Sequence, residues 1–258
     1  MTVGYLGDGI NDVNAMWEAD ISLSVDSAVD VGKAAADMVL LEKDLSVLNS
    51  GIEEGRRTFA NTLKYIFTTS SANFGNMISM AMASAFVGFL PMLPKQILIN
   101  NFLSDLPALA ISTDHVNRET LKSPQKWNVH FIRNFMVFFG LISTLFDLLT
   151  FAILLFIFQT GPDLFRTSWF LVSLLTEIGI IFVVRTRGSV FKSRLSQWLL
   201  YTSAITIIVT IILIYLPLYE LTGFIPIGGF IFFTLTLLSI SYLFVTEWLK
   251  GWFLMRMG

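Results

Sequence analysis

From residue 65 onward the sequence alternates six apolar stretches with short polar connections. A helix of about 20 apolar residues crosses the hydrocarbon core of a bilayer, so each stretch predicts a membrane span. The composition agrees, because 54% hydrophobic against 14% charged residues and a mean hydropathy of +0.69 are too apolar for a soluble domain. The predicted spans cover residues 65–87, 93–112, 135–158, 165–184, 199–216 and 227–248.

The basic residues between these spans predict which side each connection faces. They gather in the connections after the second and fourth spans: Arg118, Lys122, Lys126, Arg133, Arg185, Arg187, Lys192 and Arg194. The connections at residues 88–92, 159–164 and 217–224 contain no Lys or Arg. Because basic connections face the cytoplasm, we expect both termini there, in a multi-pass protein of the cytoplasmic (inner) membrane that contacts lipid. Basic residues in short clusters also argue against a nucleic-acid-binding face.

The first 45 residues carry short elements of alternating type. Strand-like runs at residues 3–6, 21–25 and 38–41 alternate with helical patterns at 13–19 and 28–37. This βαβαβ order predicts part of a parallel α/β sheet that is too small to be stable without further partners.

The predicted fold is therefore mainly α, in three segments. An α/β fragment covers residues 1–45, a charged amphipathic stalk helix covers 46–64, and a transmembrane domain with six spans covers 65–258.

Two carboxylates stand close together where the first predicted strand ends and a helical pattern begins. Asp8, Asn11 and Asp12 belong to the run Gly-Asp-Gly-Ile-Asn-Asp at residues 7–12. Strand-to-helix turns of this kind carry phosphate and magnesium chemistry in α/β domains. The alternative is an Asp–Gly turn with a helix cap, but a cap needs only one of the two acids.

Polar side chains inside the first two predicted spans share helix faces. Asn73 and Asn76 are three residues apart, and Asn101 and Asp105 are four apart with Ser104 beside them. Buried carboxylates and amides in hydrocarbon need partners, and transporters place such groups on broken helices to bind cations.

Pro107 lies on the second of these spans and cannot donate a hydrogen bond to the carbonyl of Leu103. We therefore expect the helix to loosen there and to expose main-chain oxygens. Asp147 and Glu177 are further intramembrane acids, and Glu177 is a possible additional cation ligand. Hydrogen bonding between helices is the alternative role for all of these polar residues.

These residues together resemble the P-type cation-transporting ATPases. Residues 7–12 match the Gly-Asp-Gly-x-Asn-Asp signature that closes their haloacid-dehalogenase-like phosphorylation domain, and Glu54-Gly55-Arg56 followed by Asn61 resembles their stalk. The ion ligands of the family's fifth and sixth membrane helices fall where this chain has Asn73, Asn101, Ser104, Asp105 and Pro107. The resemblance extends over essentially the whole chain.

The resemblance implies roles and cofactors. Asp8 is then a ligand of the catalytic Mg²⁺, Asn11 binds the phosphoryl oxygen, and Asp12 belongs to the same metal site and holds the surrounding network. ATP and Mg²⁺ are the implied cofactors, and a divalent cation is the cargo. The implied cargo site is Asn73, Asn76, Asn101, Ser104 and Asp105, with Glu177 as a possible member.

Within the superfamily, the bacterial magnesium-transporting ATPases are the most similar. Heavy-metal pumps have only two spans after the motif, and calcium pumps carry a glutamate where this chain has Asn76. Fewer carboxylates suit Mg²⁺, which gives up its water reluctantly. One local departure is Val13-Asn14-Ala15-Met16, where those pumps usually have Ala-Pro-Ala-Leu.

The family's Asp-Lys-Thr-Gly-Thr phosphorylation motif and nucleotide-binding domain do not occur in the sequence. We therefore expect a carboxyl-terminal portion of a pump that is inactive alone and needs the amino-terminal half as its partner. The alternatives are a non-catalytic pump remnant or regulatory membrane subunit, a pump for another divalent cation such as Ca²⁺, and a passive channel. The direction of transport, the stoichiometry and the oligomeric state stay open.

Overall fold

The computed structural model describes residues 2–42, 44–186, 188–190 and 193–257. The chain divides into two compact units, Met1–Arg57 and Thr58–Gly258. The boundary falls inside one helix, α3 (Leu45–Phe86), which is 42 residues long. The predicted stalk and the first predicted span are therefore parts of a single unbroken helix.

The first unit is a small parallel α/β sheet. Its strands β1 (Gly4–Leu6), β2 (Ile21–Val25) and β3 (Met38–Leu40) pair in that order, and both pairings are parallel. The 3-10 helix η1 (Ile10–Asp12) leads into α1 (Val13–Glu18), and α2 (Asp30–Ala35) connects β2 to β3. The strands and helices thus alternate as the sequence predicts.

The core of this unit is thin. Val13, Met16 and Leu23 are buried, but Trp17 is 71% exposed and Met38 is 59% exposed. Neither β1 nor β3 pairs with a further strand among the described residues. The small sheet consequently leaves much of its apolar surface uncovered, as expected for a domain of this size.

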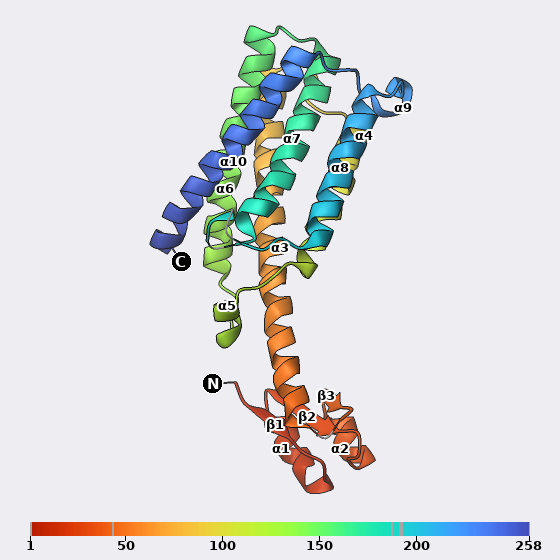
Figure 1. The fold of residues 1–258 in the computed structure, drawn as a ribbon, viewed down its shortest axis with the longest axis vertical. Coiled ribbons are helices and arrows are strands. Elements are labelled where there is room, and N and C mark those ends of the chain that lie inside the picture. The colour runs from red at the N-terminus through yellow and green to blue at the C-terminus, as the bar shows by residue number, and fades with distance from the viewer. Residues whose placement is uncertain (1, 43, 187, 191–192, 258) are drawn as a thin grey trace. The chain divides into compact units, whose positions relative to one another are not determined.

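The second unit is a helical bundle. It contains the second half of α3 and the helices α4 (Pro94–Ala110), α5 (Arg118–Lys122), α6 (Val129–Ala152), α7 (Pro162–Val184), α8 (Gln197–Tyr215), α9 (Tyr219–Thr222) and α10 (Gly229–Met257). The short helices η2 (Ile111–Thr113) and η3 (Ile153–Ile157) extend α4 and α6. Helix α7 packs against α4, α6 and α10, and α8 packs along α4 (Figure 1).

Four helices of the described chain are long and apolar enough to cross a membrane. They cover Val129–Ile157, Pro162–Val184, Gln197–Tyr215 and Gly229–Arg256 and correspond to the last four predicted spans. The central helix α7 has 83% of its most apolar window buried, against 22–39% for the other three. Neither α3 nor α4, which has 17 residues, is among these four helices, so the first two of the six spans stay a prediction.

Helices α3 and α6 approach each other closely at two glycines. A Cβ added to Gly75 lies 3.0 Å from the Gly140 carbonyl oxygen, and one added to Gly140 lies 3.1 Å from the Ser71 carbonyl oxygen. The Thr144 hydroxyl donates across this contact to the Gly75 carbonyl, at 3.2 Å. This contact fixes the part of α3 that carries Asn73 and Asn76.

The connections with basic residues lie at one end of the bundle. Figure 1 shows α5 and the connection from α7 to α8 at the same end as the carboxyl terminus. The other connections, including α9, lie at the opposite end. This arrangement suits the predicted sidedness, although Arg187 and Lys192 lie outside the described residues.

Candidate cation site

A cavity of about 150 Å³ lies between α3, α4 and α7. Its walls include Asn73 from α3, Asn101, Ser104 and Asp105 from α4, and Glu177 from α7. These five side chains all belong to the set predicted from the sequence, and the fold brings them together from segments up to 104 residues apart. At roughly 30 Å³ per water molecule, the cavity has room for a small cation with several waters.

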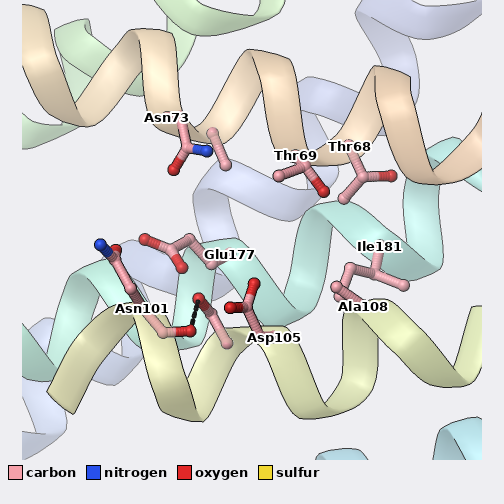
Figure 2. A pocket seen from close by; sticks show the side chains of 10 residues that line it. Thr68, Thr69, Asn73, Asn101, Asp105, Ala108, Glu177 and Ile181 are labelled. Carbon is pink, nitrogen blue, oxygen red and sulfur yellow. Dashed lines mark hydrogen bonds between the residues drawn. The ribbon is translucent and has the colours of Figure 1, made fainter. Parts of the chain in front are cut away.

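Asp105 is the carboxylate in this cavity that is free to bind. Neither a hydrogen bond nor an ion pair connects its side chain to another described residue, and the side chain is exposed. Figure 2 shows Asp105, Asn101 and Glu177 around a common space, with Asn73 approaching from the facing helix. Oxygen atoms from three helices can therefore reach one bound ion.

Glu177 is buried and held in place by neutral donors. Its Oε1 accepts hydrogen bonds from the amides of Asn76 and Asn100 (2.9 Å for Asn100) and from the Ser173 hydroxyl at 3.0 Å. The side chain is only 8% exposed. Three donors on one oxygen stabilise the charged carboxylate at a fixed position in the cavity wall.

Asn76 has a different place from the one predicted. It does not line the cavity, because its amide nitrogen donates to Glu177 from outside the cavity wall. The predicted set thus separates into side chains that face the cavity and one that supports a cavity carboxylate.

The expectation of exposed main-chain oxygens at Pro107 is wrong for the Leu103 carbonyl. Helix α4 stays helical through Pro107, and the Thr206 hydroxyl of α8 donates to the Leu103 carbonyl at 3.3 Å. Thr206 and Leu103 are 0% and 5% exposed. A buried carbonyl without its helical donor is costly, so a neighbouring helix supplies the donor.

Asp147, the other acid in the bundle interior, does not line the cavity. Its Oδ2 accepts from the Ser79 hydroxyl at 2.6 Å, and its Oδ1 accepts from the Trp169 indole at 3.0 Å. Both carboxylate oxygens are engaged, and the residue is 3% exposed. Asp147 therefore joins α3, α6 and α7 and leaves no free oxygen atom for an ion.

A third buried carboxylate, not in the predicted set, lies where α4 ends. Asp114 is 2% exposed and pairs with Lys64 of α3 at 2.8 Å and with Arg185 at 3.2 Å. The Asn61 amide donates to the Asp114 carbonyl at 3.0 Å. This cluster connects α3 to the ends of α4 and α7, the three helices that form the cavity.

The Gly-Asp-Gly turn of the first unit follows β1, as the sequence predicts. The Asp12 carboxylate accepts from the backbone N–H of Gly9 at 3.0 Å and of Asp8 at 3.2 Å, and from the Tyr5 hydroxyl at 3.1 Å. These bonds, that of Gly9 first, hold the pKa of Asp12 below its ordinary value of 3.8. Asp12 therefore organises the turn from within.

The side chains of Asp8 and Asn11 form none of these hydrogen bonds to the Asp12 carboxylate. Both side chains are exposed, and among the described residues no partner engages the Asp8 carboxylate. An exposed carboxylate beside an amide fits a Mg²⁺ ligand set, since Mg²⁺ prefers oxygen and keeps several waters. The described residues contain no group of three or more His, Asp or Glu that could hold a metal.

The sequence reasoning missed Thr206, Ser79, Trp169 and Asp114. Thr206 has a recognisable signal, because Ser203, Thr206 and Thr210 repeat at helical spacing within an otherwise apolar helix. Asp114 directly follows the second predicted span, which makes it a candidate for a buried ion pair. No local pattern marks Ser79 or Trp169, since their role depends on a distant acid.

Known proteins resemble the chain over most of its length. Residues 89–252 match the family described as "Cation transporting ATPase, C-terminus". A "Magnesium-transporting ATPase, P-type 1" of Salmonella typhimurium is 43% identical, over 99% of this chain and 29% of that protein. The protein of the same description from Escherichia coli is 44% identical over the same shares.

A more distant relative is the "Calcium-transporting ATPase" of Bacillus subtilis. It is 29% identical over 83% of this chain and 25% of its own length. The chain thus spans about 29% of the length of the magnesium-transporting relatives that it matches.

Proposed function

The chain belongs to the P-type cation-transporting ATPases, and we propose on this basis that it forms the carboxyl-terminal, cation-binding part of an ATP-driven Mg²⁺ pump. The observation that carries this proposal is the cavity of about 150 Å³ between α3, α4 and α7, with the free carboxylate of Asp105 in its wall. The pump lies in the cytoplasmic membrane and crosses it six times in this part, with α3 and α4 as the first two spans.

The charge of the cavity suits a divalent cation. Asp105 and Glu177 contribute two carboxylates, and Asn73, Asn101 and Ser104 contribute neutral oxygens. Two negative charges in a low-dielectric interior offset the charge of one divalent cation, which lowers the cost of moving it out of water. Helix α4 positions Asp105 and α7 positions Glu177, so the relative position of the two helices decides the affinity.

The neutral side chains favour Mg²⁺ over Ca²⁺ as the cargo. Asn76 and Asn100 donate to Glu177 and add no third carboxylate to the site. Ca²⁺ takes 6–8 oxygen ligands directly, whereas Mg²⁺ keeps several waters and needs fewer protein oxygens. A roomy cavity with few carboxylates therefore suits a partly hydrated Mg²⁺. The magnesium-transporting description of the 43% identical relative supports the same choice.

The Gly-Asp-Gly turn provides one half of the phosphorylation chemistry. Asp8 would hold a catalytic Mg²⁺, which neutralises charge on a transferring phosphoryl group. Asn11 would donate to a phosphoryl oxygen, and Asp12 keeps the turn in place through its bonds to Gly9 and Tyr5. The phosphorylated aspartate and the ATP site belong to a partner segment, the amino-terminal half of the pump.

Helix α3 is the segment that would couple phosphorylation at the Gly-Asp-Gly turn to cation binding in the cavity. It runs without interruption from Leu45 to Phe86 and carries Asn73. As the stalk of the pump, α3 would transmit a movement of its amino-terminal end to the wall of the cavity.

The test of this proposal is Mg²⁺ uptake by the complete pump with Asp105→Asn. The substitution keeps the size of the side chain and removes its charge, so we expect uptake to be abolished. Glu119→Gln is the control, because Glu119 is an exposed acid outside the cavity, and it should leave uptake unchanged. Normal uptake by the Asp105→Asn pump would remove Asp105 from the site.

A second test uses this chain alone. Because the phosphorylated aspartate is not part of it, we expect neither phosphoenzyme formation from ATP nor Mg²⁺-stimulated ATP hydrolysis. A trapped phosphoenzyme on the purified chain would contradict the assignment of that step to a partner segment.

A further inference from the structure

We propose that Thr206 is a positioning residue for the cation cavity. Its hydroxyl replaces the hydrogen bond that Pro107 removes from α4, and it thereby fixes the turn that carries Asp105. This inference rests on the proposed function, because it assigns a role to Thr206 through the cavity of that function. Thr206 does not line the cavity.

The hydrogen bond of Thr206 differs from those of its neighbours. Serine and threonine hydroxyls inside helices ordinarily donate to the carbonyl four residues earlier in the same helix. Thr202 and Thr210 of α8 do so, with bonds of 2.9 Å to Trp198 and 2.8 Å to Thr206. Thr206 instead donates to the Leu103 carbonyl on α4. The carbonyl that it reaches is the one that Pro107 leaves without a helical donor.

The Leu103 peptide lies inside the functional turn of α4. Asn101 precedes it, and Ser104 and Asp105 follow it directly. The Ser104 hydroxyl donates back to the Asn101 carbonyl at 3.2 Å within the same turn. The orientation of the Leu103 carbonyl therefore sets the direction in which Asp105 leaves the helix.

Burial makes this bond necessary. Thr206 is 0% exposed and Leu103 is 5% exposed, so no water can replace the hydroxyl without repacking α4 against α8. If the hydroxyl is absent, the Leu103 carbonyl must rotate to find another donor. That rotation moves the Asp105 carboxylate away from the position in which it and Glu177 can bind the same cation, and the cation affinity falls.

The experiment is a double-mutant cycle between Thr206→Val and Pro107→Ala in the complete pump. The readout is the Mg²⁺ concentration that gives half-maximal ATP hydrolysis, measured together with the maximal rate. Valine keeps the shape of threonine without the hydroxyl. Alanine at position 107 restores a backbone N–H that can donate to Leu103. The positioning role predicts that the second substitution removes the effect of the first.

We expect Thr206→Val to raise the half-saturating Mg²⁺ concentration about fivefold, the effect of one lost hydrogen bond, with little change in the maximal rate. Thr206→Ser keeps the hydroxyl and should restore the wild-type value. Thr246→Val is the matched control, because Thr246 is equally buried and donates within its own helix to Tyr242. In the Pro107→Ala background, Thr206→Val should have no effect.

Two outcomes would overturn the positioning role alone. One is an unchanged half-saturating concentration for Thr206→Val, and the other is an equal shift in both backgrounds. If the Thr206→Val pump does not assemble, assembly must return in the Pro107→Ala background, and its failure to return also overturns the role. Asp105→Asn, measured in parallel, separates the two proposals, because a normal Mg²⁺ response of that variant overturns the cation site itself.

Discussion

Two buried acids of the bundle, Asp147 and Glu177, have similar sequence surroundings and opposite environments. Asp147 gives both carboxylate oxygens to donors on two other elements, Ser79 and Trp169. Glu177 is held through one oxygen, Oε1, and lines a cavity that also contains the free carboxylate of Asp105. An acid with every oxygen engaged joins helices, whereas one with an open side next to a second acid is equipped to bind a cation.

Of the substitutions that test this comparison, we expect Glu177→Gln to have the largest effect, and that effect is on cation binding. Glu177→Gln keeps an oxygen that accepts hydrogen bonds but removes one of the two cavity charges. We expect the half-saturating Mg²⁺ concentration of the complete pump to rise more than about tenfold, because the attraction between opposite charges in contact inside a protein is worth several kcal/mol. The amount of folded protein should be unchanged. A wild-type Mg²⁺ response would place Glu177 in the same class as Asp147.

For Asp147, we expect the substitution Asp147→Ala to reduce the stability of the fold and to leave the half-saturating Mg²⁺ concentration nearly unchanged. The substitution leaves the Ser79 hydroxyl and the Trp169 indole without their acceptor. We expect a loss of about 2 kcal/mol in the free energy of unfolding, measured by denaturant titration of the purified chain in detergent. Cation half-saturation of the folded pump should stay within about twofold, as for a small change in binding free energy.

The close contact of α3 with α6 should respond to a single methyl group. A Cβ at position 140 lies 2.6 Å from Phe74 Cδ1 and 3.1 Å from the backbone carbonyl oxygen of Ser71, so Gly140→Ala crowds the contact between the two helices. We expect it to destabilise the bundle by about 1 kcal/mol in the same titration. Gly251→Ala on α10 is the control, because a Cβ there meets nothing within 4 Å. Equal effects of the two substitutions would contradict a tight α3–α6 contact.

The smallest predicted effect concerns a third engaged carboxylate, Asp12. It raises the pKa of Tyr5 above 10.0 through the hydrogen bond to the hydroxyl. Asp12→Asn should therefore shift one tyrosine of the chain to a lower pKa in an ultraviolet difference titration. An unchanged tyrosine titration would show that the bond is absent in solution.

The same bond has a pH dependence of definite sign. Since the pKa of Asp12 is lowered in the folded unit, its contribution to stability is complete above 3.8 and is lost as the pH falls through the lowered value. Carboxyl chemical shifts followed from neutral pH downward should show Asp12 titrating below its ordinary value of 3.8.

The sequence alone predicts the helices and one face of the site. Apolar length predicts the last four membrane helices, and the spacing of Asn101 and Asp105 predicts a shared helix face that does line the cavity. The distinction between Glu177 and Asp147 needs the fold, because it depends on donors from other helices. The hydrogen bond from Thr206 to the Leu103 carbonyl could not be predicted for the same reason, since Thr206 lies 103 residues away in the chain.

The position of the bound cation can be measured directly by anomalous diffraction. Mn²⁺ binds to oxygen ligands of the kind that hold Mg²⁺ and gives an anomalous diffraction signal, so crystals of the complete pump can be examined with it. We expect a peak in the cavity between α3, α4 and α7, within about 2–2.5 Å of an Asp105 carboxylate oxygen. A peak beside Asp147, with the cavity empty, would contradict it.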